Sequence, residues 1–267
     1  MLYELKDTSR AEALFAGMED TMILSCLQGM MGTVLVTDRE HPRSALAAAP
    51  CFSFYAGEPE RELAAWRPRG EVCMVPPDRR WAALIEECWP RAEKTTRYAI
   101  RKDTKFDRKR LTELAASLPA GYELRRIDGA LYEQCRESGL FCDCVAHFGS
   151  REGYLRQGRG FGVVKDGKLL SAASSFSVYR GGIEIEIDTV PEERRRGLAA
   201  AAGAALILSC LEDGLYPSWD AANPASVALA EKLGYELRGE YECYWLDGPG
   251  DGEAPADKLT RTGGTER

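Results

Sequence analysis

A run of three arginines, Arg194 to Arg196, is followed directly by Gly197 and a stretch of small residues. Glycine lets the backbone approach a ligand without a Cβ in the way. The first turn of a helix has unpaired amides and a partial positive charge, and neighbouring arginines add charge-assisted hydrogen bonds. This combination suits phosphate binding. The alternative is a solvated basic turn before an ordinary packed helix.

The segment before the arginines alternates apolar and acidic residues. Isoleucines occupy positions 183, 185 and 187, and Glu184, Glu186 and Asp188 alternate with them. A strand places the two sets on opposite faces, so the isoleucines can pack on the alanine-rich helix that follows. Three like charges on one strand face would repel one another, which suggests affinity for a cationic amine.

The elements that must position these residues follow from periodicity and turn signals. The Asp166-Gly167 pair predicts a tight hairpin turn. We expect helices over 9–28 (split near Gly17), 78–89, 107–117, 129–138, 150–157, 196–211 and 224–233. We expect strands over 32–38, 44–50, 51–57, 71–75, 95–103, 122–128, 160–166, 168–179, 181–190 and 216–221, with a final pair over 234–246.

Composition excludes several classes of protein. A chain of 267 residues with 45% hydrophobic and 29% charged residues is ordinary for a globular protein. The net charge of −7 argues against general nucleic-acid binding, and we expect no such partner. The basic stretch 91–110 favours a solvated face; contact with the acidic strand, an acidic ligand or a nucleic acid are the alternatives.

The cysteines and the N-terminus indicate a cytoplasmic protein. Nine cysteines cannot pair completely, no CxxC pair occurs, and the two histidines lie far apart in sequence, so we expect no metal site. Apolar neighbours suggest buried thiols in a reducing compartment. The N-terminus has no signal-peptide core, and no apolar run approaches the ~20 residues of a membrane span, so we expect no membrane partner.

The segment from Arg194 to Ala199 resembles the phosphate-loop pattern Arg/Gln-x-x-Gly-x-Gly/Ala of the GNAT superfamily, the acyl-CoA-dependent N-acyltransferases. Downstream, Asn223 and Leu233-Gly234-Tyr235 match the family's Asn before a helix and its terminal Leu-Gly-Phe/Tyr. The resemblance covers residues 122–246. Four segments resemble the sequences of a bacterial group of two-part GNAT acetyltransferases: EIEIDT, RRRGLA, YPSWDAAN and LAEKLGY.

The resemblance implies a mixed α/β fold with a mostly antiparallel central sheet flanked by helices, and an additional N-terminal α/β domain. We expect the N-terminal domain over 1–118 and the acetyltransferase domain over 119–246. A degenerate duplication is an alternative origin for the first domain. The last residues, 247–267, hold glycines and prolines and no aromatic residue, so we expect a disordered tail there.

The activity implied by the resemblance is direct transfer of an acetyl group from acetyl-CoA to a primary amine, without a metal. The acceptor would be a small molecule or a peptide, and the sequence does not indicate an oligomeric state. Asn223 would contact the coenzyme or only cap its helix. The implied coenzyme-binding residues are Asp188, Thr189, Val190, Arg194, Arg195, Arg196, Gly197, Leu198, Ala199, Ala200 and Asn223.

A carboxylate can remove the proton of the attacking amine, directly or through water. Glu186 and Glu184 are the candidates, and Glu186 is preferred because it lies nearer the expected separation of the strands. The alternative is that these carboxylates have a structural or substrate-binding role and transfer no proton. Phe141, His147 and Trp219 are candidate substrate-binding residues; for His147 and Trp219 a buried structural role is the alternative.

The chain departs from the family at Ala230, where many members carry a tyrosine that protonates the leaving thiolate. Tyr235 and Ser226 lie nearby in sequence but do not match that position. A non-catalytic acyl-CoA-binding protein with a sensor or regulatory role is therefore the alternative function.

Overall fold

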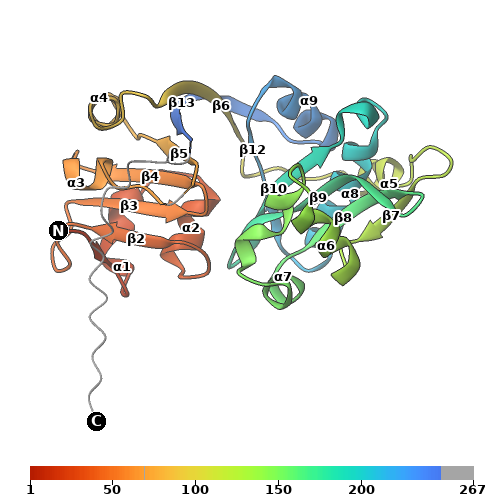
Figure 1. The fold of residues 1–267 in the computed structure, drawn as a ribbon, viewed down its shortest axis with the longest axis horizontal. Helices are drawn as coiled ribbons and strands as arrows, with labels where there is room; N and C mark the ends of the chain where they lie inside the picture. The colour runs from red at the N-terminus through yellow and green to blue at the C-terminus, as the bar shows by residue number, and fades with distance from the viewer. Residues whose placement is uncertain (69, 248–267) are drawn as a thin grey trace, which may run out of the picture. The chain divides into compact units, whose positions relative to one another are not determined.

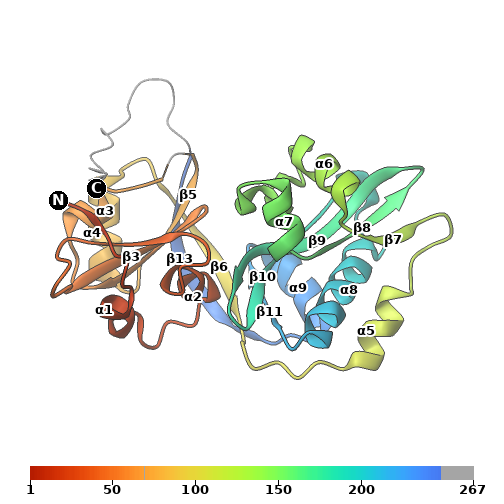
Figure 2. The same ribbon diagram turned by 90° about the horizontal axis from the view of Figure 1, so that it is seen from below.

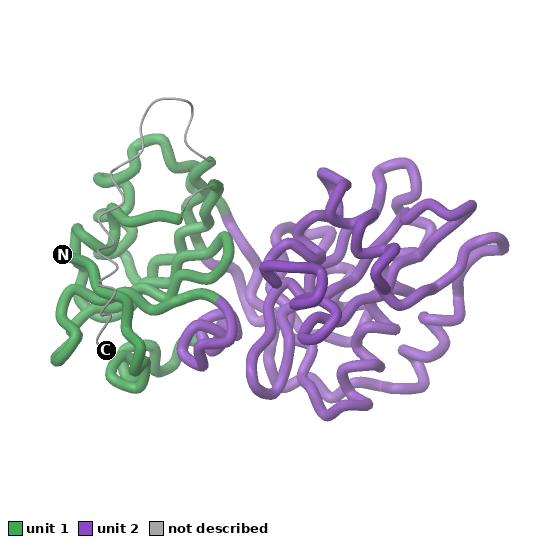
Figure 3. Tube along the Cα trace, turned by 60° about the horizontal axis from the view of Figure 1, so that its bottom comes forward, with its two compact units in different colours: residues 1–18, 32–95, 242–267 green, residues 19–31, 96–241 purple. Residues whose placement is uncertain are grey.

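The computed structural model describes residues 1–68 and 70–247, and the chain forms two compact units (Figure 3). Unit 1 comprises residues 1–18, 32–95 and the chain from 242; unit 2 comprises 19–31 and 96–241. The predicted boundary between 118 and 119 falls inside unit 2, and the predicted division into domains stays a prediction. Of the predicted tail, only Asp247 lies among the described residues.

Unit 1 is built on a sheet with the strand order β1-β2-β3-β4-β5-β13. Neighbouring strands are antiparallel except β4 and β5. Its core includes Leu35, Tyr55 and Trp81. The elements are β1 (Tyr3–Glu4), α1 (Ser9–Glu12), η1 (Ala13–Phe15), β2 (Thr33–Val36), β3 (Ser44–Ala49), β4 (Phe52–Gly57), α3 (Arg61–Ala64), β5 (Val72–Val75) and α4 (Arg79–Cys88).

Unit 2 is built on a sheet with the strand order β11-β10-β9-β8-β7, in which only β10 and β11 are parallel. β12 belongs to the other sheet, an eight-stranded one whose order continues from β13 to β6 and then to β12, with β12 antiparallel to β6. The strands are β7 (Glu123–Arg126), β8 (Gly160–Lys165), β9 (Lys168–Tyr179), β10 (Gly182–Thr189), β11 (Tyr216–Ser218) and β12 (Asp220–Ala221). Two strands run from one unit into the other: β6 (Glu93–Ile100) and β13 (Leu237–Leu246).

Helices cover both faces of the unit 2 sheet (Figures 1 and 2). α6 and α7 lie on one face, and α8 with α5 lies on the other (Figure 2). The helical elements are α2 (Thr21–Leu27), α5 (Arg108–Ala115), α6 (Gly129–Glu137), η2 (Cys142–Cys144), η3 (Ala146–Phe148), α7 (Arg151–Gln157), η4 (Pro191–Glu193), α8 (Leu198–Glu212) and α9 (Pro224–Leu233). The predicted mixed, antiparallel-rich α/β class is confirmed.

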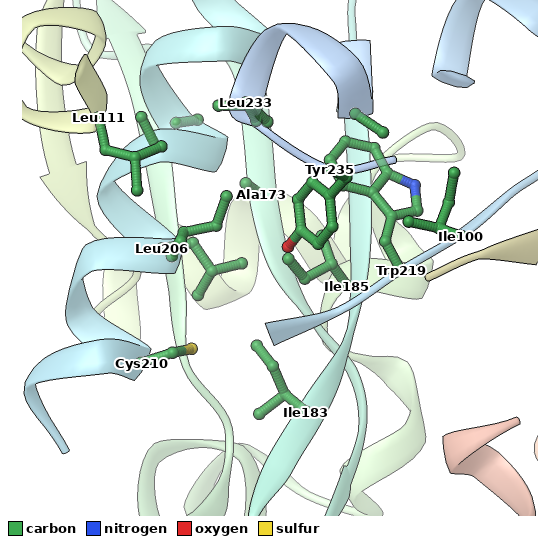
Figure 4. Close-up of a cluster of buried hydrophobic side chains, with 14 of the residues drawn as sticks. Ile100, Leu111, Ala173, Ile183, Ile185, Leu206, Cys210, Trp219, Leu233 and Tyr235 are labelled. Atoms are coloured by element: carbon green, nitrogen blue, oxygen red, sulfur yellow. The ribbon is translucent and has the colours of Figure 1, made fainter. Parts of the chain in front are cut away.

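The alternation along β10 sorts its side chains between the two faces, as predicted. Ile183 and Ile185 join Leu206 of α8 in the main core of the unit (Figure 4). Small residues let α8 approach closely: a Cβ at Gly203 would lie 3.1 Å from Cδ1 of Ile187. The acidic residues of β10 therefore face away from α8.

Local turn chemistry explains where the predictions held and where they failed. Asp166 and Gly167 have φ of 49° and 76°, which confirms the tight hairpin turn between β8 and β9. The predicted final pair of strands over 234–246 is wrong. Gly234 ends α9 in the left-handed conformation, and a single strand, β13, follows because the chain continues through Gly239 without a turn.

Candidate active site

The turn between β10 and α8 has two left-handed residues. Arg195 has φ of 61° and Gly197 has φ of 84°. The left-handed conformation costs an arginine ~1–2 kcal/mol, so the surrounding turn must impose it. Gly197 is the N-cap of α8, and a Cβ built on it would meet no atom within 4 Å. The turn therefore presents bare backbone to open space.

The first turn of α8 keeps its amides unpaired. Gly197 has no side chain with which to cap the helix, and the first helical bond runs from Ala201 N–H to the Gly197 carbonyl at 3.0 Å. Within the described residues, the amides of Leu198, Ala199 and Ala200 have no acceptor. An anion at this end would satisfy them and interact favourably with the helix dipole.

The three arginines lie differently around this turn. Arg194 donates from Nε to the Thr189 carbonyl at 3.2 Å, which ties the turn to the end of β10. Arg196 Nε lies 3.3 Å from Glu193 Oε2, and the Tyr122 hydroxyl donates to the same carboxylate at 2.5 Å. All three arginines are exposed, so their guanidinium groups are accessible to an anion.

β10 and β11 separate after a short paired stretch. They pair only from Gly182 to Glu184, and after Ser218 the chain leaves β10 and pairs with β6 as β12. Among the described residues, the edge of β10 from Ile185 to Thr189 therefore has no strand partner on that side. On its other side the carbonyl of Asp188 accepts from the Ser171 hydroxyl at 3.0 Å.

Glu184 lies where the two strands separate, and it is buried with 3% exposure. Its Oε2 accepts a hydrogen bond from the Thr21 hydroxyl of α2. Its Oε1 lies 4.0 Å from the Lys102 ammonium, which donates to the Trp219 carbonyl at 2.8 Å. These contacts give Glu184 a fixed position inside unit 2.

Glu186 and Asp188 lie further along the same face and are half-buried. Burial, reinforced by Asp188 and Asp143 and opposed by Arg97, raises the pKa of Glu186 to about 8. Burial and Asp143 likewise raise the pKa of Asp188 to about 6, against the opposing charge of Arg194. A carboxyl that titrates near neutral pH suits proton transfer.

The segment between α6 and α7 supplies two further groups to this face. Asp143 lies in η2, and His147 in η3 has Nε2 3.8 Å from Asp143 Oδ1. The His147 ring packs edge-on against Phe176 of β9, with centroids 4.4 Å apart. Burial lowers the pKa of His147, although Asp143 opposes this. Glu186, Asp188, Asp143 and His147 thus form one cluster of titratable groups.

Other predicted residues lie elsewhere. Phe141 is buried in a second core with Leu131 and Tyr154, and Trp219 is buried in the main core. The Trp219 ring packs against Tyr235 at 5.5 Å, on the α8 face of the sheet (Figure 4). Their contact with a substrate stays a prediction.

Asn223 is confirmed as the N-cap of α9. Its side chain accepts from Ser226 N–H at 2.9 Å, and Pro224 occupies the first helical position. Its contact with a coenzyme stays a prediction. Ala230 is fully buried, and the nearby Tyr235 hydroxyl donates to the Pro217 carbonyl at 2.6 Å.

Sequence reasoning missed a group of charged residues beside Glu184. Arg97 Nε donates to Asp220 Oδ1 at 2.7 Å, and the Tyr241 hydroxyl donates to the same oxygen at 3.0 Å. Asp20 caps α2, and its pKa is raised to about 7 by burial and Glu184. The alternation in YPSWDA could have placed Asp220 on the same face as Glu184. Nothing in the sequence indicates that Asp20 or Arg97 lies near these two carboxylates.

Among the described residues, no group of three or more His, Cys, Asp or Glu side chains is arranged to hold a metal ion. The nine cysteines form no disulfide bond with one another. No helix in residues 1–68 or 70–247 is long and apolar enough to cross a membrane.

Comparison with known proteins agrees with this architecture. The sequence model of the family described as GNAT acetyltransferase matches residues 12–244, so the chain belongs to the GNAT acetyltransferase family. The structure is similar to that of a GCN5-related N-acetyltransferase-like protein from Streptococcus suis 89/1591, with 40% identity and a TM-score of 0.85. That similarity covers 90% of this chain and 99% of the other.

Two further relatives are more distant or partial. The uncharacterized N-acetyltransferase YdfB of Bacillus subtilis (strain 168) is 33% identical over 141 residues, or 48% of this chain. The match spans about half the length of that relative, 49%. A tandem GNAT protein from the clavulanic acid biosynthesis pathway shares the fold at 15% identity, with a TM-score of 0.53 over 94% of this chain and 100% of its own.

Proposed function

We propose that the protein is an N-acetyltransferase that moves an acetyl group from acetyl-CoA to a primary amine of a small molecule or peptide. Membership of the GNAT acetyltransferase family supports this activity. The observation that supports it most is the turn before α8, where bare backbone at Gly197 adjoins three helical amides that lack acceptors in the described chain.

The groups at this turn fit a diphosphate because they offer donors and positive charge. In this proposal the amides from Arg195 to Ala200 hold the diphosphate of coenzyme A, and the arginine side chains screen its charge. The free edge of β10 up to Val190 hydrogen-bonds the pantetheine arm, and Asn223 contacts the same arm. The bound coenzyme supplies the acetyl group as a thioester.

Glu186 is the proposed general base. An alkylamine is protonated at neutral pH, because its pKa lies near that of lysine, ~10.4. Ionised Glu186 accepts a proton from it, directly or through water, so that the neutral amine can attack. Asp188 and Asp143 keep the proton affinity of Glu186 high and attract the cationic substrate.

Direct transfer fits the cysteine environment better than an acyl-enzyme does. Cys144 is buried with 0% exposure, and burial, followed by the negative charge of Glu186, raises its pKa well above that of a free thiol. The thiolate is the nucleophilic form of cysteine. Cys144 is therefore held in its unreactive form beside the proposed base.

Calorimetric titration of acetyl-CoA and coenzyme A into the wild type and Gly197→Glu tests the coenzyme site. The substitution puts a negative side chain at the diphosphate, and we expect affinity to fall ~100-fold or more. Gly214→Glu is the matched control, because Gly214 has φ of 70° and equally open space at the other end of α8. If the wild type binds neither ligand, or both variants bind equally, the proposed coenzyme site is wrong.

A non-catalytic acyl-CoA binder is the second candidate. Two features favour it, because both leave the leaving thiolate without a tyrosine to protonate it. Ala230 stands at the family's tyrosine position, and the Tyr235 hydroxyl donates its hydrogen bond to the Pro217 carbonyl. It predicts coenzyme binding without acetyl transfer to any member of a panel of primary amines.

A further inference from the structure

The left-handed conformation of Arg195 is not explained by contacts of its own side chain. Its φ of 61° lies in a region that non-glycine residues avoid, because Cβ crowds the following carbonyl oxygen. Among the described residues, no hydrogen bond or ion pair holds its exposed guanidinium group. The neighbouring residues must therefore impose this conformation, and Arg194 and Arg196 are each tied to a fixed point.

The first tie joins the turn to the end of β10. Arg194 Nε donates to the Thr189 carbonyl at 3.2 Å. Thr189 is buried, and its hydroxyl lies 2.7 Å from the hydroxyl of Ser171 on the neighbouring strand β9. The backbone N–H of Arg194 also donates to the Pro191 carbonyl at 3.3 Å. The chain directly before Arg195 is thus fixed to the sheet.

The second tie is a clamp formed by Tyr122, Glu193 and Arg196. The Tyr122 hydroxyl and Arg196 Nε lie 2.5 and 3.3 Å from the same oxygen, Glu193 Oε2. Arg196 Nη1 also donates to the Tyr122 hydroxyl oxygen at 3.4 Å. The Tyr122 ring packs against the main core, and the Lys165 ammonium lies 4.7 Å from its centre. The clamp therefore anchors the chain after Arg195 to a residue 74 positions from Arg196.

The clamp places a negative charge beside the proposed anion site. Glu193 is half-buried, with 20% of its side chain exposed. Glu192 is fully accessible, and its side chain makes no hydrogen bond or ion pair in residues 1–68 or 70–247. By charge alone, a carboxylate near the turn before α8 should weaken the binding of an anion. A carboxylate held there by two donors indicates a second effect, which is to order the turn.

We propose that the clamp of Tyr122, Glu193 and Arg196 holds Arg195 in the left-handed conformation before the coenzyme binds. Left-handed residues in a turn direct successive N–H groups toward one concave side, which is a recurrent anion site. A turn that is already in this conformation does not incur its cost on binding. Tyr122 and Glu193 are positioning residues, because they act through the backbone of the turn. The inference rests on the proposed function, since it concerns the same coenzyme site.

Calorimetric titration of coenzyme A into the full chain tests the clamp with a matched pair, Glu193→Ala and Glu192→Ala. Both variants lose one negative charge near the turn, so electrostatics alone predicts tighter binding for both. We expect Glu192→Ala to bind up to about threefold more tightly. Glu193→Ala should bind ~5- to 30-fold more weakly, which is the equilibrium equivalent of the left-handed strain. Tyr122→Phe changes no charge and should bind ~3- to 10-fold more weakly.

Substitutions at Arg195 distinguish preorganisation of the turn from a loss of contacts. Arg195→Gly and Arg195→Ala both remove the guanidinium group, but only glycine adopts a positive φ without strain. With Glu193 present, the two variants should bind coenzyme A within about twofold of each other, because the clamp fixes the turn. In the Glu193→Ala background, the glycine variant should bind ~5- to 30-fold more tightly than the alanine variant. In an acetyl-transfer assay, Glu193→Ala should raise KM for acetyl-CoA and leave kcat unchanged.

The outcomes separate this inference from the proposed function. If the wild type does not bind coenzyme A, the proposed coenzyme site is wrong and the clamp has no role in it. If the wild type binds, and Glu193→Ala binds at least as tightly, the clamp is overturned and the coenzyme site stands. Wild-type affinity in Tyr122→Phe, or a glycine–alanine difference at Arg195 that does not depend on Glu193, likewise overturns the clamp alone.

Discussion

The Thr21 hydroxyl donates a hydrogen bond to Glu184 across 163 positions of sequence. Thr21 begins α2, and Ser25 of the same helix donates to the Val178 carbonyl of β9 at 2.6 Å. α2 therefore packs on the carboxylate face of β9 and β10, although its neighbours in sequence belong to unit 1. The position of Glu184 depends on this segment.

Thr21→Val should destabilise the protein. The substitution keeps the shape of the side chain and removes the donor to a carboxylate oxygen of Glu184. An unsatisfied buried acceptor costs ~1–3 kcal/mol, so the free energy of unfolding should fall by about that much in urea titration. Thr112→Val, at an exposed position of α5, is the control; equal stability of the two variants would contradict the structural role of Thr21.

Acetyl transfer should depend on the ionisation of Glu186. Because burial raises the pKa of this carboxyl to about 8, kcat/KM should rise about tenfold per pH unit below 8. Glu186→Gln should lower kcat ~100- to 10,000-fold and remove the inflection near pH 8. A Gln variant with a wild-type profile would exclude Glu186 as the base.

The same raised pKa should make Glu186 a source of instability at alkaline pH. The carboxyl is protonated in both states below its ordinary value of 4.5, and between pH 4.5 and about 8 only the unfolded chain releases the proton. Stability should therefore fall as pH rises through this window, and the loss is complete above pH 8.

Thermal unfolding of Glu186→Gln at two pH values checks this dependence. The variant should unfold at least about 2 °C above the wild type at pH 8.5, and the difference should shrink at pH 5. Glu123→Gln, exposed on β7, should show no pH-dependent difference. A difference that grows toward acid pH would show that the carboxyl is ionised in the folded state.

Tyr235→Phe should distinguish a structural role of Tyr235 from a role as the general acid. The hydroxyl is buried and donates to Pro217, so its removal should cost ~1 kcal/mol of stability, measured by urea titration. In the proposed mechanism kcat stays within about threefold of wild type, because this hydroxyl donates its proton to the Pro217 carbonyl. A loss of ~100-fold in kcat without unfolding would identify Tyr235 as the general acid.

Much of the fold was predictable because local signals agreed with the tertiary structure. The hydrophobic alternation of β10 and the alanine-rich composition of α8 each specify one face, and the two faces pack as expected. The final strand was mispredicted because Gly239 adopts extended backbone, which sequence alone does not distinguish from a turn.

The sequence by itself determined the turn from Arg194 to Gly197 and the order of the acidic residues on β10. These features follow from residue type and from the fixed period of a strand, so no distant residue is needed to find them. Only the tertiary structure decided that two distant segments meet at Glu184: α2 with its N-cap supplies Thr21 and Asp20, and β6 with the residues after it supplies Arg97 and Lys102. Burial and charge at one point depend on residues far apart in the chain, and hence the raised pKa values of Glu186, Asp188 and Asp20 appear only after folding.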